Sequence, residues 1–80
     1  MVVVRLKPRE LELLHIIIKN NNGMYQVDGT RVIVDRRNVE KIIQQIGDFF
    51  ISHGLDKTDE PTPLGLEIET LQDKFLSHIN

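Results

Sequence analysis

The hydrophobic positions of the chain follow two different periods, which predict strands in some segments and helices in others. In residues 2–6 one side of the chain is wholly apolar, with Val2, Val4 and Leu6, and the other side carries Val3 and Arg5. This period of two is typical of a short strand. Residues 24–34 alternate in the same way, and the pair Asp28-Gly29 in their middle predicts a β-hairpin with a type I′ turn. We therefore expect a small antiparallel sheet of two or three strands.

The predicted turn sets which residues of the hairpin lie opposite each other. With Asp28 and Gly29 at its centre, Val27 is expected opposite Thr30 and Tyr25 opposite Val32. One face of the hairpin is then apolar, and it is formed by Tyr25, Val27, Val32 and Val34. The other face carries polar residues, so that one side of the sheet is expected to face water.

Two helices are predicted on either side of this hairpin. The first begins at Pro8, because proline suits the first turn of a helix, and it ends at the Asn- and Gly-rich residues 20–23. The second follows Asp35, which is placed to cap it, and carries the strongest periodic signal of the chain. Gly54 is expected to end this helix in the left-handed conformation, and Gly47 inside it marks a close crossing with another element.

A third helix is predicted from the Thr62-Pro63 pair, an N-cap followed by proline at the first helical position, to the C-terminus. Its apolar residues form one narrow stripe, Leu64, Ile68, Leu71, Phe75 and Ile79. Leu66 points away from the stripe and Leu76 lies at its edge. We expect the stripe to need a partner, because a domain of 80 residues has little core to cover it.

The elements thus follow the order β-α-β-β-α-α, which predicts an α+β fold with a small antiparallel sheet packed by three helices. The length of 80 residues indicates one domain over residues 1–80. The absence of cysteine excludes disulfides, thiol chemistry and cysteine-bound metals. No apolar run approaches the roughly 20 residues that span a bilayer, and no signal-peptide pattern precedes the first strand, so we expect a soluble, cytoplasmic protein without membrane contact.

No residue pattern of the sequence indicates a catalytic, cofactor-binding or metal site. His15, His53 and His78 lack the spacing of a zinc site. Residues 56–67 begin and end with carboxylates, as calcium loops do, but Pro61 stands where such a loop needs glycine. The acidic residues of the third helix are interpreted as a solvated face, because nothing predicts the burial that a general acid needs. The protein is expected not to be an enzyme and to carry no cofactor.

Charge is distributed unevenly between the two halves of the chain. Residues 1–39 contain seven basic and four acidic side chains, whereas residues 40–80 contain three basic and eight acidic ones. An acidic half suits a basic protein partner, or it serves only solubility. The predicted partner-binding residues lie in the connector before the third helix and on that helix: Asp56, Asp59, Glu60, Leu66, Glu67, Asp73 and Leu76.

A basic patch offers an alternative function. Arg31, Arg36 and Arg37 are expected to cluster between the hairpin and the second helix, where they could contact nucleic acid as a transcriptional regulator does. The hairpin, however, precedes the second helix instead of following a basic recognition helix as a wing does, and the chain is acidic overall with a pI near 5.8. A solvated charged rim is the favoured interpretation, and nucleic acid is the less favoured partner.

Residues 47–75 resemble the C-terminal part of short bacterial proteins that have no assigned function. The resemblance rests on Gly47-Asp48-Phe49, His53-Gly54-Leu55-Asp56, Glu60-Pro61-Thr62, Gly65 and Ile68-Glu69-Thr70-Leu71-Gln72-Asp73-Lys74. It implies an uncharacterised immunity factor or interaction module, and it assigns no active-site residue. Together with the acidic half, it predicts a non-catalytic protein–protein interaction module that binds another protein or a second copy of itself as a homodimer.

Overall fold

The computed structural model of the protein describes residues 1–19 and 23–79. It is an α+β fold in the predicted order β-α-β-β-α-α. The elements are β1 (Val2–Arg5), α1 (Pro8–Ile17), β2 (Tyr25–Asp28), β3 (Arg31–Val34), α2 (Arg36–His53) and α3 (Pro63–Leu76). α1 ends at Ile17 with Ile18 as its C-cap, before the predicted end at residues 20–23, of which residues 20–22 lie outside the described residues.

The three strands form one antiparallel sheet in the order β1-β3-β2. β3 is the central strand, and β1 pairs with it from Val2 opposite Val34 to Arg5 opposite Arg31. The predicted N-terminal strand is therefore confirmed and joins the hairpin. Its side chains alternate as expected, since Val4 is buried and Arg5 is exposed.

The hairpin forms, but its predicted register is wrong. Tyr25 lies opposite Val34 and Val27 opposite Val32, because the two loop residues are Gly29 and Thr30 instead of Asp28 and Gly29. Gly29 has φ +63° while Thr30 does not have a positive φ, the pattern of a type II′ turn. Each residue of β2 thus pairs with a residue of β3 two positions beyond the predicted one. Because side chains alternate with a period of two, the side chains expected on one face still share it.

Side chains near the predicted positions cap the helices. Asp35 accepts a hydrogen bond from the backbone N–H of Arg37 at the start of α2, and the Thr62 hydroxyl accepts one from Gly65 at the start of α3. At the start of α1, Glu10 reaches back to accept a hydrogen bond from the backbone N–H of Lys7, with 2.7 Å between N and Oε1. All three helices begin where the sequence predicts.

Gly54 ends α2, but the expected left-handed cap is wrong. Its φ is −101°, a conformation that any residue adopts. The space around it requires glycine, because a Cβ on Gly54 would lie 2.8 Å from the carbonyl oxygen of Phe50 and 3.0 Å from Gly65 Cα. Gly47, where the close crossing was predicted, faces only the end of the Gln72 side chain. The closest approach of α2 and α3 is at the Gly54–Gly65 contact.

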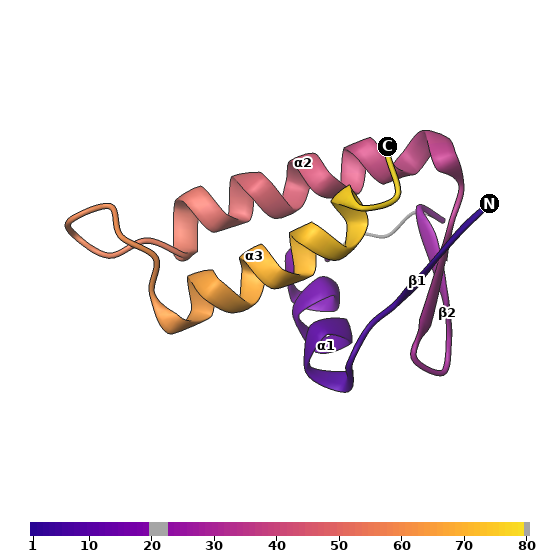
Figure 1. Ribbon diagram of the computed structural model, residues 1–80, viewed down its shortest axis with the longest axis horizontal. Helices are drawn as coiled ribbons and strands as arrows, with labels where there is room; N and C mark the ends of the chain where they lie inside the picture. The colour runs from indigo at the N-terminus through magenta and orange to yellow at the C-terminus, as the bar shows by residue number, and fades with distance from the viewer. Residues whose placement is uncertain (20–22, 80) are drawn as a thin grey trace.

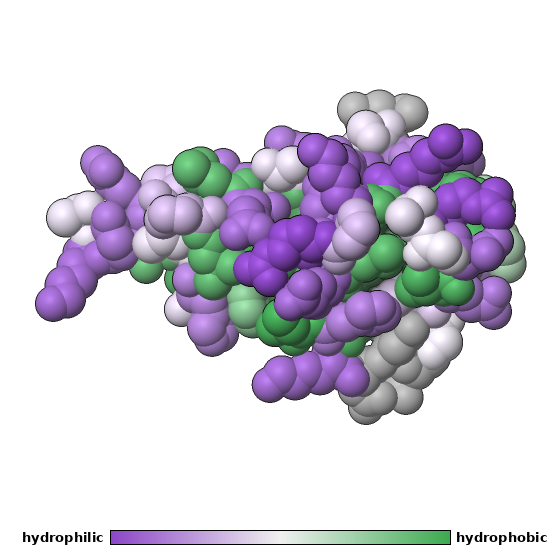
Figure 2. Space-filling model, turned by 90° about the horizontal axis from the view of Figure 1, so that it is seen from below, coloured by the Kyte–Doolittle hydropathy of each residue, from purple (hydrophilic) through white to green (hydrophobic). Residues whose placement is uncertain are grey.

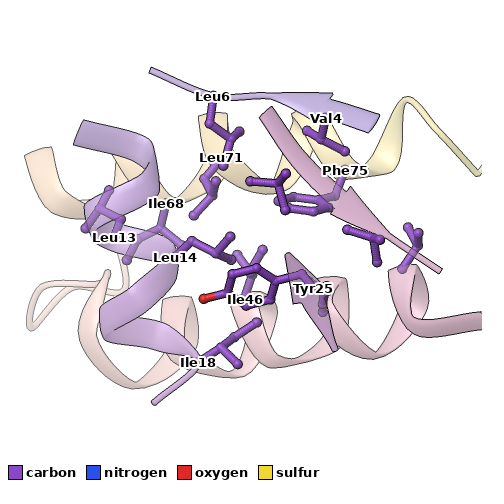
Figure 3. Close-up of a cluster of buried hydrophobic side chains, with 14 residues drawn as sticks. Val4, Leu6, Leu13, Leu14, Ile18, Tyr25, Ile46, Ile68, Leu71 and Phe75 are labelled. Carbon is purple, nitrogen blue, oxygen red and sulfur yellow. The ribbon is translucent and has the colours of Figure 1, made fainter. Parts of the chain in front are cut away.

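The core lies between the helices and one face of the sheet (Figure 3), where side chains from β1, α1, α2 and α3 converge. Ile68, Leu71 and Phe75 of α3 are fully buried in it. The expectation that the stripe of α3 needs a partner is therefore wrong for these three residues, because the core of the same chain covers them. Ile79, at the end of the predicted stripe, remains partly exposed.

α2 and α3 run side by side along the long axis of the molecule and project beyond the sheet (Figure 1). The connector 54–62 joins them at one end, while the sheet and both chain termini lie at the other end. The long axis measures 39 Å against 24 Å and 23 Å for the other two. The acidic connector is thereby held at the tip of a helical hairpin, far from the arginines of the sheet.

Candidate functional site

A small cleft lies between the start of α1 and the middle of α3. It has a volume of about 180 Å³ and is lined by Lys7, Arg9, Glu10, Glu67 and Thr70. Sites for small molecules usually measure roughly 300–1,000 Å³. The cleft is thus smaller than a pocket that encloses a typical ligand.

Two ion pairs occupy the charged groups of this cleft. Lys74 Nζ lies 2.6 Å from Glu10 Oε1, and Arg9 Nε lies 2.9 Å from Glu67 Oε2. Burial raises the pKa of Glu10, but the hydrogen bonds from Lys74 and from the backbone N–H of Lys7 together outweigh it, so the pKa lies below its ordinary value. A general acid needs a raised pKa, so Glu10 is suited to holding α1 against α3 and not to proton donation.

The connector at the tip of the helical hairpin is ordered by one carboxylate. Asp56 Oδ1 accepts hydrogen bonds from the hydroxyl of Thr58 at 2.7 Å and from the backbone N–H groups of Thr58 at 2.8 Å and Glu60 at 3.1 Å. These bonds lower the pKa of Asp56. The carboxylates of Asp59 and Glu60 take no part in these three bonds, and both residues are exposed.

Two exposed apolar side chains lie next to this connector. Leu66 is on the first turn of α3 and is 55% exposed, and Ile51 is on the last turn of α2 and is 69% exposed. After Met1 they are the most exposed large apolar side chains among residues 1–19 and 23–79. In Figure 2 the connector end is mostly hydrophilic, and hydrophobic surface begins immediately inside it.

The structure keeps two of the four predicted partner-binding residues of α3, Leu66 and Asp73, on one face and separates Glu67 and Leu76 from them. Leu66, Thr70 and Asp73 follow the i, i+4, i+7 spacing and share the outward face of α3, on which all three are exposed. Leu76 is partly exposed and lies about 15 Å along the helix from Leu66. Glu67 instead faces α1, where Arg9 pairs with it.

We give the name acidic tip surface to a set of exposed residues on the connector and the two helices that it joins. They are Ile51, Asp56, Asp59, Glu60 and Leu66 near the tip, and Asp73 farther along the outward face of α3. Ile51 is absent from the predicted site, although the sequence contains a signal for it: it falls outside the apolar periodicity of its helix, between the stripe residues Phe50 and His53.

The three arginines of the alternative patch are divided between the two ends of β3. Arg31 lies at the turn and pairs with Asp28, whereas Arg36 and Arg37 follow the other end of the strand. Arg37 pairs with Asp35, its guanidinium Nη2 lying 3.1 Å from Oδ2. Two of the three charges are thus partly neutralised by neighbouring carboxylates.

The histidines lie on separate elements. His15 Nδ1 is 3.0 Å from the hydroxyl of Tyr25, and His53 stacks on Phe49 with 4.3 Å between ring centroids. Within the described ranges, no group of three or more His, Asp or Glu side chains is arranged to hold a metal ion. No helix in the same part of the chain combines the length and the apolar content that crossing a bilayer requires.

Comparison of the chain with protein-family models, with curated proteins and with solved structures finds no match in any of the three. The resemblance of residues 47–75 to short bacterial proteins therefore stays an expectation. The function has to be argued from the surface itself.

Proposed function

We propose that the protein is a non-catalytic cytoplasmic module that binds another protein through the acidic tip surface. The observation that carries this proposal is the pair Ile51 and Leu66, two large apolar side chains that the fold leaves exposed beside the connector. Apolar patches with a polar rim mark protein-binding sites, and in this proposal Ile51 and Leu66 supply the apolar part of such a site. The cysteine-free composition suits the reducing cytoplasm.

The chemistry of this surface favours a partner with an apolar centre and basic residues around it. Asp59, Glu60 and Asp73 are exposed, and no basic residue pairs with them among the described residues. Carboxylates around an apolar contact raise the association rate of a basic partner and exclude acidic ones. The surface also stands at the end of the longest dimension of the molecule, where the sheet does not obstruct an approaching protein.

A photo-crosslinking amino acid introduced at Leu66 tests the proposal in cells of the native host. We expect one specific adduct with a basic protein, and we expect the adduct to disappear on replacing Glu60 and Asp73 by lysine. The matched control is the same crosslinker at Lys41, an exposed residue of α2 outside the acidic tip surface. Equal adducts from both positions, or an adduct that survives the charge reversals, would contradict a specific site at the tip.

A further inference from the structure

α2 and α3 touch along one edge of each helix, and three contacts locate this edge. At the tip, Gly54 lies against Gly65. Farther along the helices, the side-chain amide of Gln72 donates to the carbonyl oxygen of Ile43 at 3.2 Å, and a Cβ on Gly47 would lie 3.2 Å from the same amide nitrogen. The two helices therefore meet at positions 43, 47 and 54 of the chain on one side and at positions 65 and 72 on the other.

Ile51 and Glu69 lie beside this junction, one on each helix. Ile51 is four residues after Gly47 and three before Gly54. Glu69 has the same spacing from the two contact positions of α3, four residues after the first and three before the second. Because residues three and four apart are neighbours on a helix surface, each of the two side chains lies on the edge that faces the other helix. Both are exposed, which places them on the outer side of the junction.

We call the exposed line of residues along this junction the outer seam. Glu40 belongs to it because it lies three turns before Ile51 on the same edge of α2, and helical spacing from Glu69 adds three residues of α3. All of them are at least partly exposed, and the outer seam consists of Glu40, Ile51, Leu66, Glu69, Asp73 and Leu76. Its charged residues are all acidic. The nearest basic residue on this edge of α2 is Arg36, one turn before Glu40.

The acidic residues of the outer seam repel each other within the chain. Glu69 and Asp73 are four residues apart on α3, and no basic side chain pairs with either among residues 1–19 and 23–79. Like charges at this spacing destabilise a helix. A cationic side chain that approaches from outside and lies between the two carboxylates replaces this repulsion with attraction. The charge of the seam is therefore complementary to a basic partner.

We propose that the partner of the acidic tip surface is a basic amphipathic helix that lies along the outer seam. This inference rests on the proposed function, since Ile51, Leu66 and Asp73 belong to both surfaces. A helix fits better than an extended peptide, because the backbone N–H and C=O groups of α2 and α3 are bonded within their own helices and offer no edge for strand pairing. Recognition at the seam depends on side chains, as it does where a helix docks into a groove.

The length and the shape of the outer seam agree with such a partner. From Leu66 to Leu76 it extends about 15 Å, which matches three turns of a facing helix with apolar residues at i, i+4 and i+7. Gly47 lies between these two ends, opposite Gln72, and is partly exposed. A Cβ on Gly47 would meet only the Gln72 amide within 4 Å, so the missing side chain leaves room for close approach of the partner helix.

Fluorescence anisotropy with a defined peptide tests this proposal. The probe is a labelled peptide of leucine and lysine in which the leucines recur at i, i+4 and i+7. Its control has the same composition, but leucine and lysine alternate with the period of a strand. We expect the helical probe to bind at least about 10-fold more tightly than the control. Equal binding of the two peptides would overturn the proposal, because the surface would then recognise charge without helical shape.

Two pairs of variants with equal charge locate the contact. Gly47→Arg places a cationic side chain on the seam and should weaken binding of the helical probe at least about 10-fold, whereas Gln45→Arg should change it less than about 2-fold, because Gln45 reaches Met24 on another side of α2. Glu69→Lys and the exposed Glu12→Lys of α1 form the second pair, with the same expectation. Circular dichroism verifies that each variant is folded, and equal losses within a folded pair would overturn the proposal.

The crosslink from Leu66 in cells separates this proposal from the proposed function. Adding Gly47→Arg to the chain that carries the crosslinker should abolish the adduct, and adding Gln45→Arg should preserve it. An adduct that persists with Gly47→Arg would overturn docking of a helix along the outer seam, while the acidic tip surface would remain the binding site. If the chain gives no adduct even without these changes, the proposed function fails, and the helical partner fails with it.

Discussion

Gly54 and Gly65 bring the backbones of α2 and α3 into direct contact. A Cβ on Gly65 would lie 2.1 Å from the carbonyl oxygen of Gly54, a distance that no side-chain movement can relieve because both sides of the contact are backbone. Thr62 strengthens the same junction, since its backbone N–H donates to Gly54 O at 2.9 Å and its hydroxyl lies 3.2 Å from that oxygen. These contacts fix the angle at which the acidic tip surface is presented.

Replacing Gly65 by alanine is therefore expected to lower the free energy of unfolding by about 3 kcal/mol, the upper part of the range for overpacking. Urea denaturation measures this change. Gly47→Ala is the control, because a Cβ there would meet only Gln72 Nε2, at 3.2 Å, and a helical glycine gains up to about 1 kcal/mol on replacement by alanine. Equal losses in both variants would mean that the Gly54–Gly65 contact is not the tight point of the hairpin.

The sequence predicts the elements of this fold well because their signals are local. Pro8, Asp35 and Thr62 mark the starts of the three helices through short-range capping, and all three starts are confirmed. The alternation of β1 and of the hairpin predicts the buried face of the sheet. The turn lies one residue later than predicted, which shifts the pairing by two residues and leaves that face unchanged, since side chains alternate with a period of two.

The other errors concern contacts between residues far apart in the chain. Nothing near Gly54 in the sequence distinguishes a left-handed cap from a close approach to Gly65. The pairing of Glu10 with Lys74 spans 64 residues and has no local signal either. For the candidate site, the acidic connector and Leu66 could be predicted from pattern, whereas the engagement of Glu67 by Arg9 depends on how α1 packs against α3.

Glu10 is expected to make stability depend on pH. Because its pKa in the folded chain lies below the ordinary value of 4.5, the unfolded chain takes up the proton first as the pH falls. The stabilisation by Glu10 is fully present above that value and is lost as the pH drops through the lower pKa of the folded state. Glu10→Gln should cost about 2 kcal/mol at pH 7, a typical value for a buried hydrogen bond to a charged group.

Urea denaturation of the wild type and the Glu10→Gln variant between pH 7 and about pH 3 checks this expectation. The difference between the two proteins should shrink toward the acid end of the series. Glu12→Gln is the control, because Glu12 is on the same helix but is exposed and pairs with Arg9 only at 3.4 Å. A difference that stays constant across the series would show that the loss in Glu10→Gln does not come from the ion pair with Lys74.

Two turn residues provide a matched test of the backbone conformation. Gly29 has φ +63° and Asp59 has φ +61°, so both occupy the left-handed region. Gly29→Ala is expected to destabilise the chain by about 1 kcal/mol, since a side chain is strained there. Asp59→Gly should change stability by less than about 0.5 kcal/mol, because the relief of strain offsets the added freedom of the unfolded chain. Thermal unfolding compares the two, and a harmless Gly29→Ala would contradict the type II′ turn.

The two faces of α3 predict opposite consequences for leucine replacement. Leu71 is fully buried between the helices and the sheet, so Leu71→Ala should cost about 3 kcal/mol through lost burial and the cavity that remains. Leu66 is exposed, and Leu66→Ala should change stability by less than about 0.5 kcal/mol. If the inner face of α3 were instead covered by a partner, Leu71→Ala would leave the stability of the isolated chain unchanged. Denaturation of the purified protein therefore distinguishes a helix that packs in the core of its own chain from one that docks onto another protein. The expected result for Leu66→Ala would also mean that Leu66 can be replaced in binding experiments without loss of the fold.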